Sequence, residues 1–261
     1  MDVGRCRSRD TGQSKLAPRR RFRKLAEEPE TDALDSLLAR FEAKFPTTKE
    51  FSELARQSLP DISGYKDPDA ALFAWMEREE LLFRRLERHI VAGHLKTGFA
   101  AAGENEVDGF LSLSQTVQQR RRSRAGRALE NHLEALFVVH SVRFARGAET
   151  EHRHKPDFLF PGAAEYHNAA FPTARLTMLG VKSTLKDRWR QVLTEANRIS
   201  RKHLLTLEPG ISVNQTEQIK AHSLQLVIPK AIHASYAPAQ QSDLLSVEGF
   251  LKVVQARQIE G

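Results

Sequence analysis

Cysteine is nearly absent from this chain, whose one example, Cys6, lies in a polar N-terminal stretch. A single cysteine forms neither an internal disulfide framework nor a cysteine-based zinc module, and this usage is typical of a reducing cytoplasm. Long apolar runs are also lacking: no stretch approaches the roughly 18 residues that cross a bilayer. The arginine-rich start has no apolar segment after it, unlike a secretory signal. We therefore expect a cytoplasmic, globular protein without a membrane partner.

Positive charge, in contrast, is abundant and unevenly distributed. Residues 1–24 carry nine Lys and Arg against two acids, and a second block, QQRRRSRAGR at 118–127, has five arginines and no acid. Since each cation placed on a phosphate releases condensed counterions, a polyanion is the favoured partner. A solvated tail explains residues 1–24 equally well. The second block continues into a strong helix, which favours a role in binding for Arg122 and Arg124.

Helical periodicity dominates the N-terminal part of the chain. Residues 1–30 have no periodic apolar positions and are expected to form a basic, disordered tail. Apolar residues then recur at helical spacing until Pro46 ends the pattern, and Asp67 followed by Pro68 marks the start of a longer helix. We predict a helical subdomain over 31–100 that flanks a nucleic acid or takes part in dimerisation.

The pattern changes after a polar, glycine-containing stretch near 101–110. Short apolar runs then alternate with helical patterns, an order that favours an α/β domain over 101–261 with a mixed central sheet flanked by helices. The expected elements are a helix over 126–140, strands over 157–160 and 175–182, a helix over 187–199, strands over 203–207 and 223–229, and a helix over 243–256.

Three charged residues stand at the borders of these elements. Lys182 ends an apolar strand, where its ammonium must reach water, an acid or a ligand. Asp157 begins another strand, and Glu195 is predicted on the helix over 187–199, at the boundary between core and cleft. A snorkelling lysine and a Pro-Asp turn would explain the first two separately. Together, the three predict a divalent-metal site beside a positive charge, which suits phosphodiester hydrolysis.

Several separated stretches resemble one known family. KPDFLFPG, KSTLKDRWRQVLTEANRI with KHLLTL after it, and the upstream RRRSRAGRALENHLEALF are similar to the catalytic domain of EcoRII-type restriction endonucleases. These enzymes are members of the PD-(D/E)XK nuclease superfamily. The resemblance covers about residues 65–257 and implies a restriction-endonuclease-like fold. Because little chain precedes it, we expect action without the effector domain of such enzymes.

One departure from the superfamily pattern is informative. An acid normally lies two residues before the lysine, and this chain has Gly180 there. The EcoRII-like branch takes the acid from the following helix at the spacing K-x12-E, which Lys182 and Glu195 match. The resemblance therefore implies Asp157 and Glu195 as Mg²⁺ ligands and Lys182 as the catalytic lysine.

The resemblance also points to two supporting residues. Glu130 resembles a helix acid that completes such sites, with Glu134 as its competitor and an exposed carboxylate as the simpler explanation. Tyr166 resembles a tyrosine of the family site, although a tyrosine at the edge of the core would look the same. The nearby histidines lack the cysteines or close acids that a closed zinc site needs; they are His152, His154 and His167.

Lys186, Asp187 and Arg188 follow the catalytic strand and suit base recognition. Lysine and arginine donate to guanine, and aspartate accepts from cytosine N4, so the triplet can read G·C pairs in the major groove. The resemblance assigns this segment to the outer G·C pairs of the target. Helix capping is the alternative for Asp187, and Arg190 is expected to contact phosphate.

These inferences combine into one functional prediction. We expect a Mg²⁺-dependent type II restriction endonuclease that cuts double-stranded DNA at a CCWGG- or CCNGG-like site. A symmetric double-strand cut favours a homodimer, and a cognate DNA methyltransferase would protect the host. The alternatives are a repair or structure-specific nuclease of the same superfamily and a non-cleaving DNA-binding module.

Overall fold

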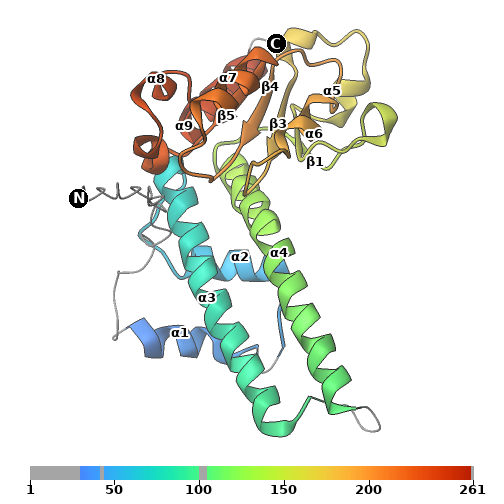
Figure 1. Ribbon diagram of the computed structural model, residues 1–261. Helices are drawn as coiled ribbons and strands as arrows, with labels where there is room; N and C mark the ends of the chain where they lie inside the picture. The colour runs from blue at the N-terminus through green and yellow to red at the C-terminus, as the bar shows by residue number, and fades with distance from the viewer. Residues whose placement is uncertain (1–29, 42–43, 100–104, 260–261) are drawn as a thin grey trace, which may run out of the picture. The chain divides into compact units, whose positions relative to one another are not determined.

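The computed structural model describes residues 30–41, 44–99 and 105–259 (Figure 1). The chain divides into two units, residues 1–40 and 41–261. The first contains α1 (Glu30–Ala39), and the predicted tail before it lies outside the described residues. No helix in the described ranges combines the length and apolarity that a bilayer crossing requires.

Two long helices form a hairpin in the second unit. α3 (Pro68–Thr97) begins as predicted, with Pro68 in its first turn and the Asp67 side chain accepting from Ala70 N at 2.9 Å. α4 (Glu106–Val139) lies beside it (Figure 1). α4 starts between five and six turns before the predicted helix, because its first half is polar on most sides and shows little periodicity. The boundary placed near residue 100 thus falls between α3 and α4.

The helix α2 (Thr48–Gln57) packs on both α3 and α4 and was missed from the sequence. Its start carries a capping box, in which Thr47 and Glu50 exchange side-chain and backbone hydrogen bonds. Four of its ten residues are buried, so tertiary packing stabilises a helix that is too short to persist alone.

A five-stranded mixed sheet forms the centre of the α/β part, as predicted. Its order is β1 (Ala145–Arg146), β2 (Phe158–Phe160), β3 (Thr177–Val181), β4 (Lys202–Leu205) and β5 (Leu224–Val227). The first three strands pair antiparallel and the last three parallel. Only β1, which has two residues, was not expected.

Side chains alternate between the two faces of this sheet, and each face has its own core. Phe158, Leu179 and Leu205 pack toward α3, α4 and α9 (Val247–Ile259). Met178 and Leu204 pack toward α6 (Trp189–Leu193) and α7 (Val213–Ala221). The remaining short helices are α5 (Ala163–His167), α8 (Pro238–Gln241) and the 3₁₀ turns η1 (Glu151–Arg153), η2 (Thr173–Arg175) and η3 (Lys230–Ser235).

One buried carboxylate joins α3 to the C-terminal part of the chain. Asp69 accepts hydrogen bonds from the backbone N–H groups of Lys230, Val247 and Glu248 at 2.9–3.0 Å. It thereby caps the N-terminus of α9 from another helix, where a negative charge also interacts favourably with the helix dipole.

Candidate active site

Asp157 and Lys182 meet at the edge between β2 and β3. Asp157 precedes β2, and its Oδ2 accepts from Lys182 Nζ at 2.8 Å and from Val181 N at 2.6 Å. The two side chains are only 19% and 11% exposed. The antiparallel pairing of β2 with β3 brings these residues together, and a partly buried ion pair results.

Glu195 lies on a bend and not on a helix, which corrects the helix predicted over 187–199. α6 ends at Leu193. The next carbonyl, of Thr194, accepts from His154 Nδ1 at 2.8 Å, and Ala196 adopts a left-handed conformation with φ of 49°. These interactions end the helix just before Glu195.

Burial and neighbouring charges perturb the Glu195 carboxyl group. Burial, reinforced by Asp157, raises its pKa from 4.5 to about 7, against the lowering influence of Lys182, His154 and Lys202. Its Oε2 is buried and has no hydrogen-bond partner in the described part of the chain. Glu195 is therefore within electrostatic reach of Asp157 and Lys182, and one of its oxygens is left for a ligand.

The chemistry of this cluster fits a hard divalent cation. Mg²⁺ binds through one or two carboxylates and completes its coordination with water and substrate phosphates. Asp157 and Glu195 supply two carboxylates, and the unpartnered oxygen of Glu195 is the kind of buried group that a cation would satisfy. Within the described residues no group of three or more His, Cys, Asp or Glu side chains is arranged to hold a metal ion.

Glu130 and Glu134 both bind Arg146. The guanidinium of Arg146 on β1 lies 2.7 Å from the first carboxylate and 2.6 Å from the second. The next residue, Gly147, donates its N–H to the Asp157 carbonyl at 3.1 Å. Glu130 and Glu134, the two predicted alternatives, thus share Arg146 as their partner. The residue after Arg146 is hydrogen-bonded to the backbone of Asp157.

Tyr166 is buried behind the segment that carries Glu195. Its hydroxyl donates to Glu151 at 2.7 Å, and Glu151 also accepts from Asn197 N at 3.2 Å. Burial, together with the Glu151 carboxylate, raises the pKa of Tyr166 to about 12. Tyr166 therefore contacts the support of Glu195, and no hydrogen bond joins it to Asp157 or Lys182 among the described residues.

The predicted base-reading triplet lies in an exposed turn before α6. Among the described residues, the side chains of Lys186, Asp187 and Arg188 form no hydrogen bond or ion pair. Two hydrogen bonds fix the backbone of this turn: Leu185 N donates to the Glu208 carboxylate, and the Lys186 carbonyl accepts from Gln215 at 2.8 Å. Asp187 does not cap α6, whose N-cap position is Arg188 without a side-chain cap. The three side chains are thus free to contact a ligand.

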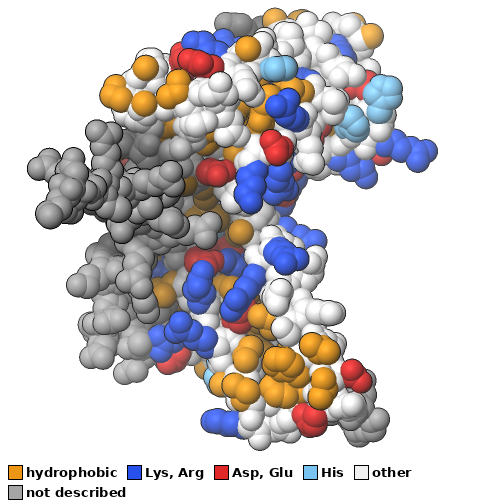
Figure 2. Space-filling view, viewed as in Figure 1, with side chains coloured by type: hydrophobic (Ala, Val, Ile, Leu, Met, Phe, Trp, Pro, Cys, Tyr) orange, Lys and Arg blue, Asp and Glu red, His pale blue; other side chains and the backbone are white. Residues whose placement is uncertain are grey.

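Arginine side chains in the 118–127 block differ in their surroundings. Arg124 is buried between α4 and α3, where it pairs with Glu79 and Glu80 and lies 4.2 Å above the Phe83 ring. The guanidinium of Arg124 is thus paired with acids on α3 inside the protein, which argues against the predicted DNA contact. Arg122 is exposed. Basic and acidic side chains lie next to one another on the face shown in Figure 2.

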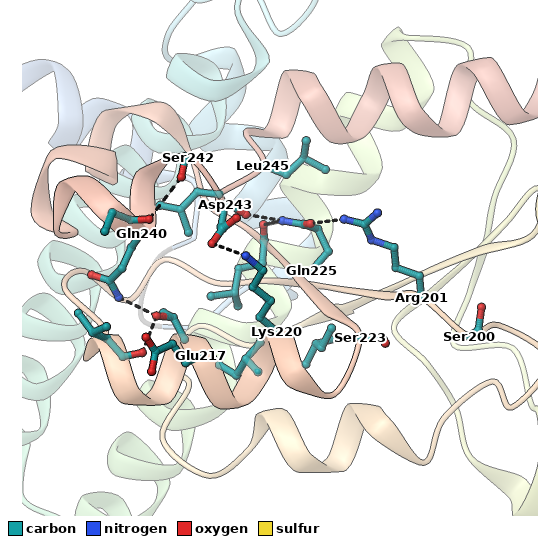
Figure 3. A pocket seen from close by; sticks show the side chains of 17 residues that line it. Ser200, Arg201, Glu217, Lys220, Ser223, Gln225, Gln240, Ser242, Asp243 and Leu245 are labelled. Carbon is teal, nitrogen blue, oxygen red and sulfur yellow. Dashed lines mark hydrogen bonds and ion pairs between the residues drawn. The ribbon is translucent and has the colours of Figure 1, made fainter.

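A cavity of about 670 Å³ lies apart from these residues, between α7, β5 and α8. Its polar side chains pair with one another: Lys220 with Asp243 at 2.8 Å and Arg201 with Gln225 at 2.7 Å (Figure 3). It contains none of the predicted site residues, and we assign it no catalytic part.

Sequence reasoning missed three residues around Glu195. They are Lys202, Glu151 and His154, the last of which the sequence raised only as a zinc ligand. Lys202 Nζ donates to the Leu193 carbonyl at 2.5 Å. It could have been found by the signal that singled out Lys182, since it too is a lysine at the border of an apolar strand.

The mixed five-stranded sheet, with helices packed on both of its faces, defines a restriction-endonuclease-like fold. The family described as EcoRII C terminal matches residues 83–251. The chain belongs to this family.

Individual relatives agree with this assignment. The chain is 39% identical over 209 residues to the type II restriction enzyme EcoRII of Escherichia coli, a match that covers 80% of this chain and 50% of the relative. It is 30% identical over 153 residues to the type II restriction enzyme SsoII of Shigella sonnei, covering 54% and 48%. The chain thus spans about half the length of these relatives.

Solved structures share the fold. Metal-depleted Ecl18kI in complex with uncleaved, modified DNA superposes with a TM-score of 0.66 at 18% identity, covering 87% of this chain and 85% of that one. The complex of restriction endonuclease PspGI with substrate DNA gives 0.67 at 14% identity, covering 83% and 95%. At such identities the likeness establishes the architecture.

Proposed function

We propose that this chain is a type II restriction endonuclease that hydrolyses double-stranded DNA at a short specific site with Mg²⁺ as its cofactor. The observation that carries the proposal is the meeting of Asp157, Lys182 and Glu195 at one edge of the sheet. An exposed turn suited to base recognition lies between the last two. Membership of the EcoRII C-terminal family and the names of the two relatives support the same activity.

Each of the three residues has a part in hydrolysis that follows from its chemistry. Bound Mg²⁺ would neutralise phosphate charge and acidify a coordinated water. Asp157 and Glu195 hold the cation through carboxylate oxygens. Lys182 places an ammonium beside Asp157 in a site largely shielded from water, where it donates to a phosphate oxygen or orients the attacking water.

The turn before α6 would read the outer G·C pairs of a CCWGG- or CCNGG-like target. Lys186 and Arg188 donate to guanine, and Asp187 accepts from cytosine. Arg190 and the exposed Arg122 bind phosphates, which adds affinity without sequence preference. Because the turn continues into the Glu195 segment, base contacts are coupled to placement of the metal ligands.

Glu130 and Tyr166 act at one remove from the metal. Glu130 fixes Arg146, which belongs to the strand beside Asp157. Tyr166 fixes Glu151 and through it the Glu195 segment. We expect their loss to weaken cleavage less than loss of Lys182 does.

A homodimer, acting in the cytoplasm, would cut both strands of a symmetric site. Large apolar side chains are exposed toward the free end of the α3–α4 hairpin, where hydrophobic atoms gather in Figure 2, and they suit such an association. They are Leu95, Val107, Phe110 and Leu111. A cognate methyltransferase would protect the host DNA.

Cleavage of unmethylated phage DNA in Mg²⁺, followed by sequencing of the ends, tests the proposal. Fragments that share one short site support restriction. Random or branch-dependent cuts would favour a repair nuclease, and binding without cuts would favour a DNA-binding module.

Lys182→Ala is the matching active-site variant. Cleavage should fall by about 10²–10⁴-fold while DNA binding is retained, because the turn that reads the bases is unchanged. Lys220→Ala, which removes an exposed lysine on α7, is the control and should cleave like the wild type. Full cleavage by Lys182→Ala would remove this lysine from the mechanism.

A further inference from the structure

The chain that carries Glu195 is held in place by side chains from other elements. At the end of α6, Lys202 Nζ donates to the Leu193 carbonyl at 2.5 Å. One residue later, His154 Nδ1 donates to the Thr194 carbonyl at 2.8 Å. Both carbonyls lie directly before Glu195 and lack helical partners, so these two donors determine where the chain leaves the helix.

Lys202 is unusual among these contacts because it is a buried cation. It begins β4, on the sheet face that α6 covers, and only 7% of its surface is exposed. Burial of an ammonium is costly unless acceptors and opposite charge compensate it. The Leu193 carbonyl supplies the acceptor, and Glu195 and Glu151 supply the attracting charges.

Four ionisable groups act on the Glu195 carboxylate: Asp157 raises its pKa, whereas Lys182, His154 and Lys202 lower it. Lys182 is already paired with Asp157 at 2.8 Å, whereas Lys202 forms its hydrogen bond with the chain that leads to Glu195. Lys202 therefore acts on Glu195 in two ways, through the backbone at Leu193 and through its positive charge.

We propose that Lys202 is a positioning residue that, through its hydrogen bond to the Leu193 carbonyl, holds Glu195 in place for binding a divalent cation. This inference rests on the proposed function, since it concerns the same metal site. Lys202 has no direct contact with DNA or metal in this scheme. Its effect passes entirely through Glu195, and this makes the proposal separable from a general role in folding.

A double-mutant cycle on the full chain tests it. The variants are Lys202→Met, Glu195→Ala and the pair combined, and the probe is Mn²⁺ binding by calorimetric titration. We expect Lys202→Met to weaken Mn²⁺ binding by about tenfold, the usual effect of removing a group that orients a metal ligand. In the Glu195→Ala background the same change should have no further effect.

Equal weakening in both backgrounds would overturn the proposal, because a merely structural lysine would disturb the Asp157 side of the site as well. Unchanged Mn²⁺ affinity in Lys202→Met would also overturn it. Lys220→Met is the control for loss of a lysine charge from the surface and should bind Mn²⁺ like the wild type. If circular dichroism shows Lys202→Met to be unfolded, Lys202→Gln, which keeps a donor but no charge, takes its place in the cycle.

Cleavage separates this inference from the proposed function. We expect the Mg²⁺ concentration for half-maximal cleavage to rise about tenfold in Lys202→Met, with specific DNA binding unchanged. If the wild type cuts at one site and Lys202→Met needs no more Mg²⁺ than the wild type, the role of Lys202 is refuted and the proposed function stands. A wild type that neither binds Mn²⁺ nor cuts DNA would refute both.

Discussion

Replacement of Glu195 by glutamine should stabilise the metal-free protein at alkaline pH. Burial raises the pKa of Glu195 from 4.5 to about 7 in the folded chain, so ionisation of this group disfavours the folded state. The cost is absent below pH 4.5, grows between pH 4.5 and 7, and is complete above pH 7. Glutamine carries no charge and avoids it.

The magnitude follows from the displacement of the pKa. A change from 4.5 to about 7 corresponds to at most about 3 kcal/mol. Because water still reaches part of the carboxyl group, we expect a gain of about 1–2 kcal/mol in the free energy of unfolding at pH 8. For a chain of this size the melting temperature should rise by about 2–8 °C.

Thermal unfolding of Glu195→Gln and wild type in EDTA, at pH 8 and at pH 5, measures this gain. The increase should be present at pH 8 and much smaller at pH 5. Addition of Mg²⁺ should stabilise the wild type more than the variant, since only the wild type keeps both carboxylate ligands. Glu217→Gln, an exposed change on α7, is the control without an effect. The same gain at both pH values would refute the reasoning, because it would not come from ionisation.

Two further substitutions test how the fold places the site. Gly180→Ala would put a methyl group 2.8 Å from a methyl group of Val192, so the free energy of unfolding should fall by about 1–3 kcal/mol in a denaturant titration. Adding Val192→Ala should recover part of this loss. An unchanged unfolding midpoint in Gly180→Ala would mean that α6 does not pack tightly on β3. Asp69→Ala leaves one buried and two partly buried N–H groups without their acceptor and should cost about 2–3 kcal/mol by the same measurement. A near-neutral result would show that the capping of α9 is dispensable.

Elements with one clear apolar face were predictable from the sequence. The start of α3 at Asp67 and Pro68 was predicted correctly, and so were four of the five strands. Prediction from the sequence failed for elements whose conformation depends on tertiary contacts. β1 is two residues long, α2 is stabilised by packing on its neighbours, and the polar first half of α4 is helical because it lies along α3.

The proximity of Asp157 and Lys182 was predictable from the sequence, whereas the surroundings of the predicted site residues were not. Asp157 and Lys182 proved to be in contact. The partners of the other charged residues lie far away along the chain, so spacing carried no information about them. Arg124, for example, is matched by Glu79 and Glu80 on a different helix. A run of arginines therefore predicts positive charge, and only the fold decides how much of it a nucleic acid can reach.

The missing acid at position 180 and the additional acid at position 195 have one structural cause. Alternation along β3 places Gly180 on the same face as Met178, which α6 covers. A Cβ atom at position 180 would lie 2.8 Å and 3.1 Å from the two methyl groups of Val192. An aspartate there would therefore push α6 away from the sheet. With glycine, α6 packs closely on β3, and Glu195, three residues after Val192, lies within electrostatic reach of Lys182. The absence of a side chain at position 180 and the position of Glu195 therefore belong to the same packing of α6 on the sheet.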